Sequence, residues 1–195
     1  LIAWNINFDI GEGLKLAAVE LPIEATNESI AACMKFIISR LRTQLIDDGY
    51  RFDVVDSVLA VCGSNPAKAM RNIKKLTESV KKSDWLLTLQ AYSRCVRIIR
   101  TQPGSYSIDP AKFTEDAEKI LFNSLEAAEG KLSDPSSFEE FISLFETMIP
   151  AINLFFEKVL VMDQDKAIRD NRLGLLERVA HLGEVSVDLS FMEGF

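Results

Sequence analysis

The sequence of 195 residues has little of what most catalytic sites require. It contains one histidine, His181, and it lacks the G-x-S-x-G, G-x-x-x-x-G-K-[ST] and G-x-G-x-x-G motifs. Zinc sites usually draw on several His or Cys ligands, and a Ser or Cys nucleophile needs a base beside it. The scarcity excludes most metal and covalent chemistry, and His181 is expected to be a structural residue of a helical segment.

Cysteines and long apolar runs are also scarce. Cys33, Cys62 and Cys95 are too widely spaced for a C-x-x-C motif, so we expect buried free thiols in a reducing compartment. The longest apolar runs, such as 159–162, fall far short of the roughly 20 residues of a bilayer-spanning helix. The first ten residues do not resemble a secretory leader, and because residue 1 is not Met we expect a piece of a longer chain.

The charge is unevenly distributed along this acidic chain, whose formal net charge is −7. Residues 1–34 hold 1 basic and 5 acidic side chains, residues 35–100 hold 13 and 6, and residues 101–195 hold 8 and 18. A basic middle segment favours a local polyanion-binding face, because attraction depends on the local field. A merely solvated face is the alternative.

Helix signals recur with their caps, whereas strand signals are scarce. Gly49 is expected to end one helix, and Pro103 with Gly104 is expected to form a loop. The expected helices cover 28–47 after an Asn27 cap, 52–61, 66–80 after Asn65 and Pro66, the segment from Asp84 to 100, 114–128 with a Thr114 cap, a segment from Asp134 and Pro135 to 148, 154–162 after a break at Pro150, and 165–182 from Asp165. The sequence therefore predicts an all-α bundle of about eight helices.

Two consecutive expected helices carry a basic face opposite an apolar face. At about 100° per residue, the helix ending at Arg100 places Ala91, Tyr92, Cys95, Val96, Ile98 and Ile99 inward, and Gln90, Ser93, Arg94, Arg97 and Arg100 outward. The preceding segment places Met70, Ile73, Leu76 and Val80 inward, and Lys68, Arg71, Lys74, Lys75 and Lys82 outward. If the helices are adjacent, the two faces form one patch.

Arginines at i and i+3 without acidic partners are unusual for a solubilising surface, where Glu–Lys pairs are expected. Such guanidinium groups bind phosphates and stack on or hydrogen-bond unpaired bases. Near the end of the chain, Phe155, Phe156, Val159 and Met162 are expected in the core. Asn171 and Arg172 are either polar contacts or a clamp holding the preceding loop, and the residues alone favour the clamp.

Several segments together resemble one family. They are F-F-E-K-V-L-V-M from Phe155 to Met162, R-x-N-R-L-x-L-L from Arg169 to Leu176, the stretch from Arg40 to Ala60, Y-S-R-C-V-R-I-I-R from Tyr92 to Arg100, and V-D-L-S-F near the end. This combination resembles the β subunit of bacterial-type tetrameric glycyl-tRNA synthetase from about residue 36 onward.

The resemblance implies a DALR-like helical anticodon-binding domain over residues 36–195, of the type shared with arginyl-tRNA synthetase, with residues 1–35 as a helical lead-in. The expected partners are tRNA(Gly) and the α subunit or a fused α region, and not DNA or a membrane. The α subunit would use ATP and Mg, so no cofactor or catalytic centre is expected here. The compartment would be bacterial cytoplasm, a plastid or a mitochondrion.

The residues expected to bind tRNA are Arg94, Arg97, Arg100, Lys68, Arg71, Lys74, Lys75, Arg169, Asn171 and Arg172. The sequence departs from the family at Ser93 and Arg94, where many members carry Lys-Arg, and at Arg97, where many carry Asn. The family's base contacts therefore do not transfer to these positions. A helical protein-interaction scaffold with a basic face is the alternative function.

Overall fold

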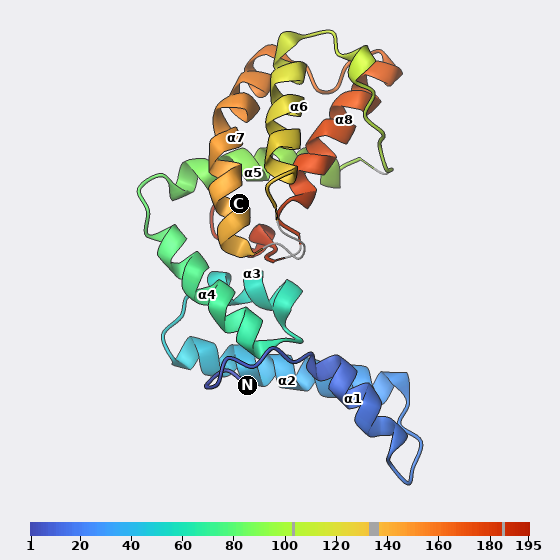
Figure 1. Cartoon of the computed structure of the whole chain (residues 1–195), viewed down its shortest axis with the longest axis vertical. Helices are drawn as coiled ribbons and strands as arrows, with labels where there is room; N and C mark the ends of the chain where they lie inside the picture. Colours follow the sequence, from blue (N-terminus) through green and yellow to red (C-terminus); the bar gives the residue numbers. More distant parts are fainter. Residues whose placement is uncertain (103, 133–136, 185) are drawn as a thin grey trace. The chain divides into compact units, whose positions relative to one another are not determined.

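The protein is all-α in a computed structural model that describes residues 1–102, 104–132, 137–184 and 186–195. Within these ranges there are eight α-helices and two short 3₁₀ helices, and no strand, which confirms the expected fold class. The helices are α1 (Ile10–Val19), α2 (Asn27–Asp47), α3 (Phe52–Cys62), α4 (Pro66–Val80), α5 (Trp85–Arg100), η1 (Pro110–Lys112), α6 (Asp116–Glu129), α7 (Phe138–Lys158), α8 (Lys166–His181) and η2 (Leu189–Phe191) (Figure 1).

The chain divides into two compact units. Unit 1 consists of Leu1–Lys81 with Ser186–Glu193, and unit 2 consists of Lys82–Val185 with Gly194–Phe195. The expected functional boundary near residue 35 falls inside α2, and therefore inside unit 1. It stays a prediction about where an anticodon-binding region begins.

Unit 1 has its core between α3 and α4, where Val58, Ile73 and Leu76 are fully buried. The segment Ser186–Glu193 returns to this unit from the far end of the sequence and is held by a backbone hydrogen bond. The amide of Asp188 donates to the Ser57 carbonyl at 2.9 Å. Of residues 1–44, all of which the structure describes, none is buried, so the first helices contribute little to this core.

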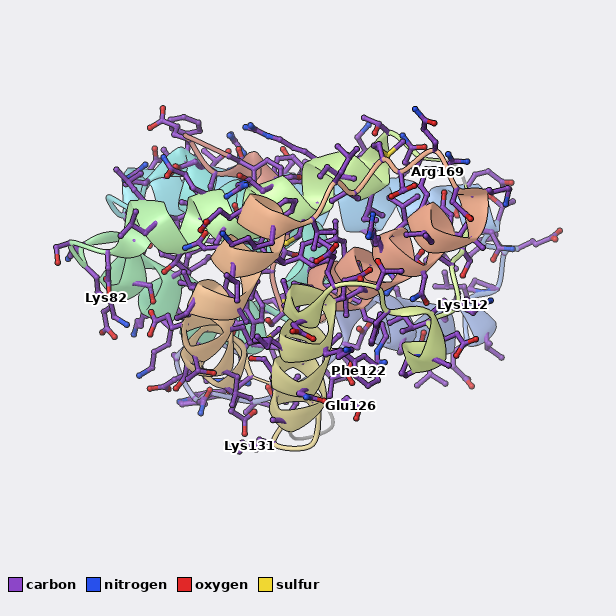
Figure 2. The ribbon with its side chains drawn as sticks, turned by 90° about the horizontal axis from the view of Figure 1, so that it is seen from above. Lys82, Lys112, Phe122, Glu126, Lys131 and Arg169 are labelled. Atoms are coloured by element: carbon purple, nitrogen blue, oxygen red, sulfur yellow. The ribbon has the colours of Figure 1, made fainter. Side chains whose placement is uncertain are left out.

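Unit 2 contains α5 to α8, with α6 against α7 and α5 against α8 (Figure 1). Its core is rich in aromatic rings that meet edge to face. The Tyr92 ring lies 5.7 Å from that of Phe141 and 5.5 Å from that of Phe145. Such edge-on pairs add to the hydrophobic gain of burying the rings. Arg178 of α8 contacts both Phe122 and Glu126 of α6, which are labelled in Figure 2.

The expected helix starts are confirmed in part. Asn65 caps α4 by accepting the Lys68 amide at 3.1 Å. The cap of α2 is Thr26 and not Asn27, because the Thr26 hydroxyl accepts the Ser29 amide at 3.2 Å. The cap of α6 is Glu115 and not Thr114.

The end of α2 agrees with the expectation for glycine. Gly49 has φ +94°, a left-handed conformation that costs a residue with a Cβ atom more than it costs glycine. The Gly49 amide bonds the Ile46 carbonyl, and the Tyr50 amide bonds the Leu45 carbonyl. The glycine therefore closes the last turn.

The predicted break at Pro150 is wrong, because α7 continues through it from Phe138 to Lys158. Buried side chains lie on both sides of the proline, including Met148, Ile152 and Phe155. Their packing offsets the cost of about 3 kcal/mol for an interior proline. The helix is capped by Ser137, and the predicted start at Asp134 and Pro135 lies outside the described residues, as does Pro103 of the predicted loop.

Candidate nucleic-acid interface

The helix α5 places three arginines on one exposed face. Ala91, Tyr92 and Cys95 are buried, as the helical spacing predicts, and Arg94, Arg97 and Arg100 are exposed. Ser93 was expected on the exposed arc, but it is only 3% exposed, and its hydroxyl donates to the Gln90 carbonyl at 3.1 Å. The prediction for Ser93 is wrong because neighbouring packing covers the edge of the polar arc. The exposed face therefore consists of Gln90 and the three guanidinium groups.

Each of these arginines lies over an aromatic ring. The guanidinium carbon of Arg94 is 4.2 Å from the ring centroid of Phe156, and those of Arg97 and Arg100 are 5.6 and 5.5 Å from that of Phe195. Contacts within about 6 Å are attractive cation–π interactions. None of the three pairings could be predicted, because the positions of Phe156 and Phe195 in the sequence give no sign of their distance from α5.

Two arginines of the α5 face, Arg94 and Arg97, are not neutralised by nearby carboxylates of the described residues. Within the part of the chain that the structure describes, neither Arg94 nor Arg97 forms an ion pair with a carboxylate. A guanidinium group keeps its charge at any physiological pH and has five N–H donors. Arg94 and Arg97 can therefore meet an anionic ligand with donors that no described carboxylate occupies.

The basic side chains of α4 are less uniform than predicted. Lys74 and Lys75 are exposed, and Lys68 is half-buried. Arg71 donates to the side-chain oxygens of Asn5 and Asn7, so its guanidinium group is already engaged by the first residues of the chain. Helix α4 belongs to unit 1 and α5 to unit 2, so the two basic faces lie on different units, and a single combined patch stays a prediction.

Arg172 of α8 is a clamp inside unit 2. It is 4% exposed and donates to Glu118 Oε1, the Leu160 carbonyl, Asp163 Oδ2 and Thr114 Oγ1, at 2.8 to 2.9 Å. Glu118 is also buried, and its second oxygen accepts the Thr114 amide at 2.8 Å. The favoured clamp interpretation of Arg172 therefore describes the observed contacts.

Asn171 and Arg169 are also engaged within the protein. The Asn171 side chain accepts the Asp109 amide at 2.6 Å and donates to the Asp109 carbonyl at 3.2 Å. Arg169, labelled in Figure 2, donates to the Asp163 carbonyl at 2.9 Å. A tRNA contact by Asn171 or Arg172 stays a prediction, because both side chains are buried and already hydrogen-bonded within the protein.

The titratable groups near the clamp and in the core are perturbed in ways that suit a structural role. The backbone N–H of Asp165, and then the guanidinium group of Arg172, lower the pKa of Asp163 from its ordinary value. Complete burial raises the pKa of the Cys95 thiol to about 12, so this thiol is unreactive.

The expectation of three buried thiols is wrong for Cys33, which is exposed on α2.

The described ranges contain neither a cluster of potential metal ligands nor a membrane-spanning helix. No group of three or more His, Cys, Asp or Glu side chains in those ranges is arranged to hold a metal ion. No helix there is long and apolar enough to cross a membrane.

A polar pocket of about 400 Å³ in unit 2 is lined in part by Lys112 and Lys166. Both lysines form ion pairs, Lys112 with Asp109 and Lys166 with Asp170.

The structure defines a class of protein: an all-α domain with an exposed face of arginines on α5. Residues 88–185, half of the chain, match the model of the DALR anticodon binding domain. The chain therefore belongs to the DALR anticodon binding domain family. The expected DALR-like fold is confirmed, and the match takes in most of α5 and all of α6, α7 and α8.

The chain is also similar to named ligases. It is 31% identical over 194 residues to the "Glycine--tRNA ligase, chloroplastic/mitochondrial 2" of Arabidopsis thaliana, which covers 98% of the chain. It is 26% identical over 162 residues (83% of the chain) to the "Glycine--tRNA ligase beta subunit" of Lactococcus lactis subsp. cremoris, and 33% identical over 135 residues (67%) to that of Anaeromyxobacter dehalogenans. The chain spans 18%, 24% and 19% of these relatives, respectively. The resemblance to the β-subunit family is confirmed.

Proposed function

We propose that this chain is the anticodon-binding part of a glycine–tRNA ligase, which binds tRNA(Gly) and positions it for aminoacylation elsewhere in the enzyme. The observation that carries the proposal is the exposed arginine face of α5, which lies within the region that matches an anticodon-binding family. The proposed amino acid, glycine, comes from the names of the relatives, since the bacterial and organellar examples are glycine–tRNA ligases.

The chemistry of the two basic faces suggests a division of labour. Phosphate contacts fix position and supply most of the affinity, whereas contacts to the edges of unpaired bases supply discrimination. Arg94, Arg97 and Arg100 are the proposed contacts to unpaired anticodon bases. The exposed lysines of α4, Lys74 and Lys75, are the proposed contacts to the phosphate backbone, with Lys68, Arg71 and Arg169 as further phosphate contacts.

The catalytic part is proposed to lie in the α subunit or a fused α region, which would use ATP and Mg. This chain should then neither activate glycine nor hydrolyse ATP when that part is absent. Its compartment is proposed to be bacterial cytoplasm, a plastid or a mitochondrion. The scaffold alternative is not favoured, because the family match covers the helix that carries the arginine face.

Fluorescence anisotropy with labelled tRNA(Gly) and a labelled non-cognate tRNA tests the proposal. At one fixed salt concentration, we expect the chain to bind tRNA(Gly) more tightly than the non-cognate tRNA. Weak binding that is equal for both tRNAs and unchanged in Arg97→Ala would favour the scaffold. Lys131→Ala is the control for Arg97→Ala, because Lys131 is an exposed cation just after the end of α6 and is not part of the arginine face of α5 (Figure 2).

A further inference from the structure

The last two residues of the chain place an aromatic ring beside the arginine face. Gly194 has φ +93°, a left-handed turn that favours glycine. The Phe195 ring lies 6.4 Å from the Tyr92 ring, at 63° to it, so the buried tyrosine supports it edge-on. The Phe195 side chain is only half-buried, and part of its surface therefore remains open.

Two guanidinium groups lie over this ring. Arg97 and Arg100 belong to successive turns of α5, and their guanidinium carbons lie at nearly equal distances, 5.6 and 5.5 Å, from the Phe195 ring centroid. A guanidinium group held against a ring has few accessible rotamers before a ligand binds, so binding costs less side-chain conformational entropy. The arrangement is therefore a partly preorganised group of one ring and two cations.

Such a group suits one kind of ligand. Every nucleobase has a π face that stacks on an aromatic ring or a guanidinium plane, and the phosphates beside it pair with the remaining N–H donors. Bases inside a duplex are already stacked on their neighbours, so only an unpaired base can use the ring.

We propose that Phe195, with Arg97 and Arg100, forms a stacking subsite for one unpaired nucleobase, an inference that rests on the proposed tRNA-binding function. Gly194 is a positioning residue, because its left-handed turn directs the ring toward α5. The subsite recognises a base by its face and not by its edge. It therefore contributes affinity for single-stranded RNA more than it discriminates between bases.

Phe195→Leu removes the π face and keeps an apolar side chain. The probe is the anticodon stem-loop of tRNA(Gly) with 2-aminopurine replacing one loop base in turn, because this fluorophore is quenched when it stacks. We expect Phe195→Leu to weaken stem-loop binding by roughly 5- to 150-fold, the range for loss of one base–aromatic stack. At one loop position, the quenching seen with the wild-type chain should be lost.

Three controls separate stacking from other roles, and a fourth experiment tests the positioning residue. Phe195→Tyr keeps the ring and should retain both affinity and quenching. Phe36→Leu makes the same change at a 66% exposed position on α2 and should have no effect. A blunt RNA duplex of equal length should bind the wild-type and Phe195→Leu chains alike. Gly194→Ala, which strains the turn, should weaken stem-loop binding without removing the ring.

The possible failures are distinguishable. If the wild-type chain binds tRNA(Gly) and Phe195→Leu binds the stem-loop with unchanged affinity and quenching, the subsite is refuted and the proposed function stands. If Phe195→Leu weakens the duplex as much as the stem-loop, the ring supports the fold or phosphate binding, and the subsite is again refuted. If the wild-type chain binds neither tRNA(Gly) nor the stem-loop, the proposed function itself fails.

Discussion

Within unit 2, Arg172 of α8 and the arginines of α5 show opposite uses of the same side chain. Arg172 is 4% exposed, and its hydrogen bonds to Glu118, Thr114 and the 160–163 loop engage its donors inside the protein. Arg97 is exposed, contacts a ring and forms no ion pair with a described carboxylate. A guanidinium group whose donors are used internally holds a fold, whereas one whose donors face outward is available to a ligand.

The largest expected effect follows from removing the internal arginine. Arg172→Ala leaves the Glu118 carboxylate buried without its cation, which typically destabilises a protein by about 3 to 5 kcal/mol. Urea unfolding followed by circular dichroism measures the free energy of unfolding. Lys166→Ala is the control, because its ion pair with Asp170 is exposed and should contribute at most about 1 kcal/mol. A loss below that for Arg172→Ala would show that the clamp is not structural.

The outward arginines should show the reverse pattern, with a loss of binding and little loss of stability. Arg94→Ala and Arg97→Ala should each cost about 1 to 3 kcal/mol of binding free energy, and more for tRNA(Gly) than for a non-cognate tRNA. Their unfolding free energies should stay within about 0.5 kcal/mol of wild type, as for most surface substitutions. Anisotropy titrations and urea unfolding of the same preparations measure both. Equal losses for the two tRNAs would reassign both arginines to phosphate contacts.

The helical faces could be predicted from the sequence because spacing determines which side chains share a side. This works for Tyr92, Cys95 and Arg97 of α5 and for Ile73 and Leu76 of α4, all of which lie as expected. It fails where a tertiary neighbour decides. Packing covers Ser93 at the edge of the polar arc. At Pro150, buried side chains on both sides keep α7 continuous.

The partners of the arginines could not be predicted for a related reason. Glu118 and Arg172 lie 54 positions apart, and Arg97 and Phe195 lie 98 apart, so no local pattern connects them. The distribution of charge along the sequence predicts a basic segment, and the family resemblance predicts that this segment binds tRNA. Only the folded chain distinguishes Arg172, whose donors are used, from Arg97, whose donors are exposed.

A smaller effect is expected at the lysines of unit 1. Lys74→Ala with Lys75→Ala should weaken all tRNAs alike and flatten the log-log salt dependence of affinity by about one to two units, because each phosphate contact releases counterions. Affinities measured at several salt concentrations give this slope. The matched control is Lys15→Ala with Lys35→Ala, which removes the same charge from exposed positions of α1 and α2. An unchanged slope would make the α4 lysines an ordinary solvated face and direct the search for phosphate contacts to Arg169.

The smallest expected effect tests the clamp through pH. Asp163 accepts the Asp165 amide at 2.9 Å and Arg172 Nη1 at 2.8 Å, and these bonds lower its pKa from 3.8. A carboxyl group with a lowered folded-state pKa stabilises the fold above its unfolded pKa, and that stabilisation disappears as the pH falls through the folded value. The unfolding free energies of the wild type and Asp163→Asn should therefore differ by a constant amount between about pH 5 and 7 and converge below about pH 4. A difference that persists unchanged at the acidic end would mean that Asp163 acts through packing and not through its charge.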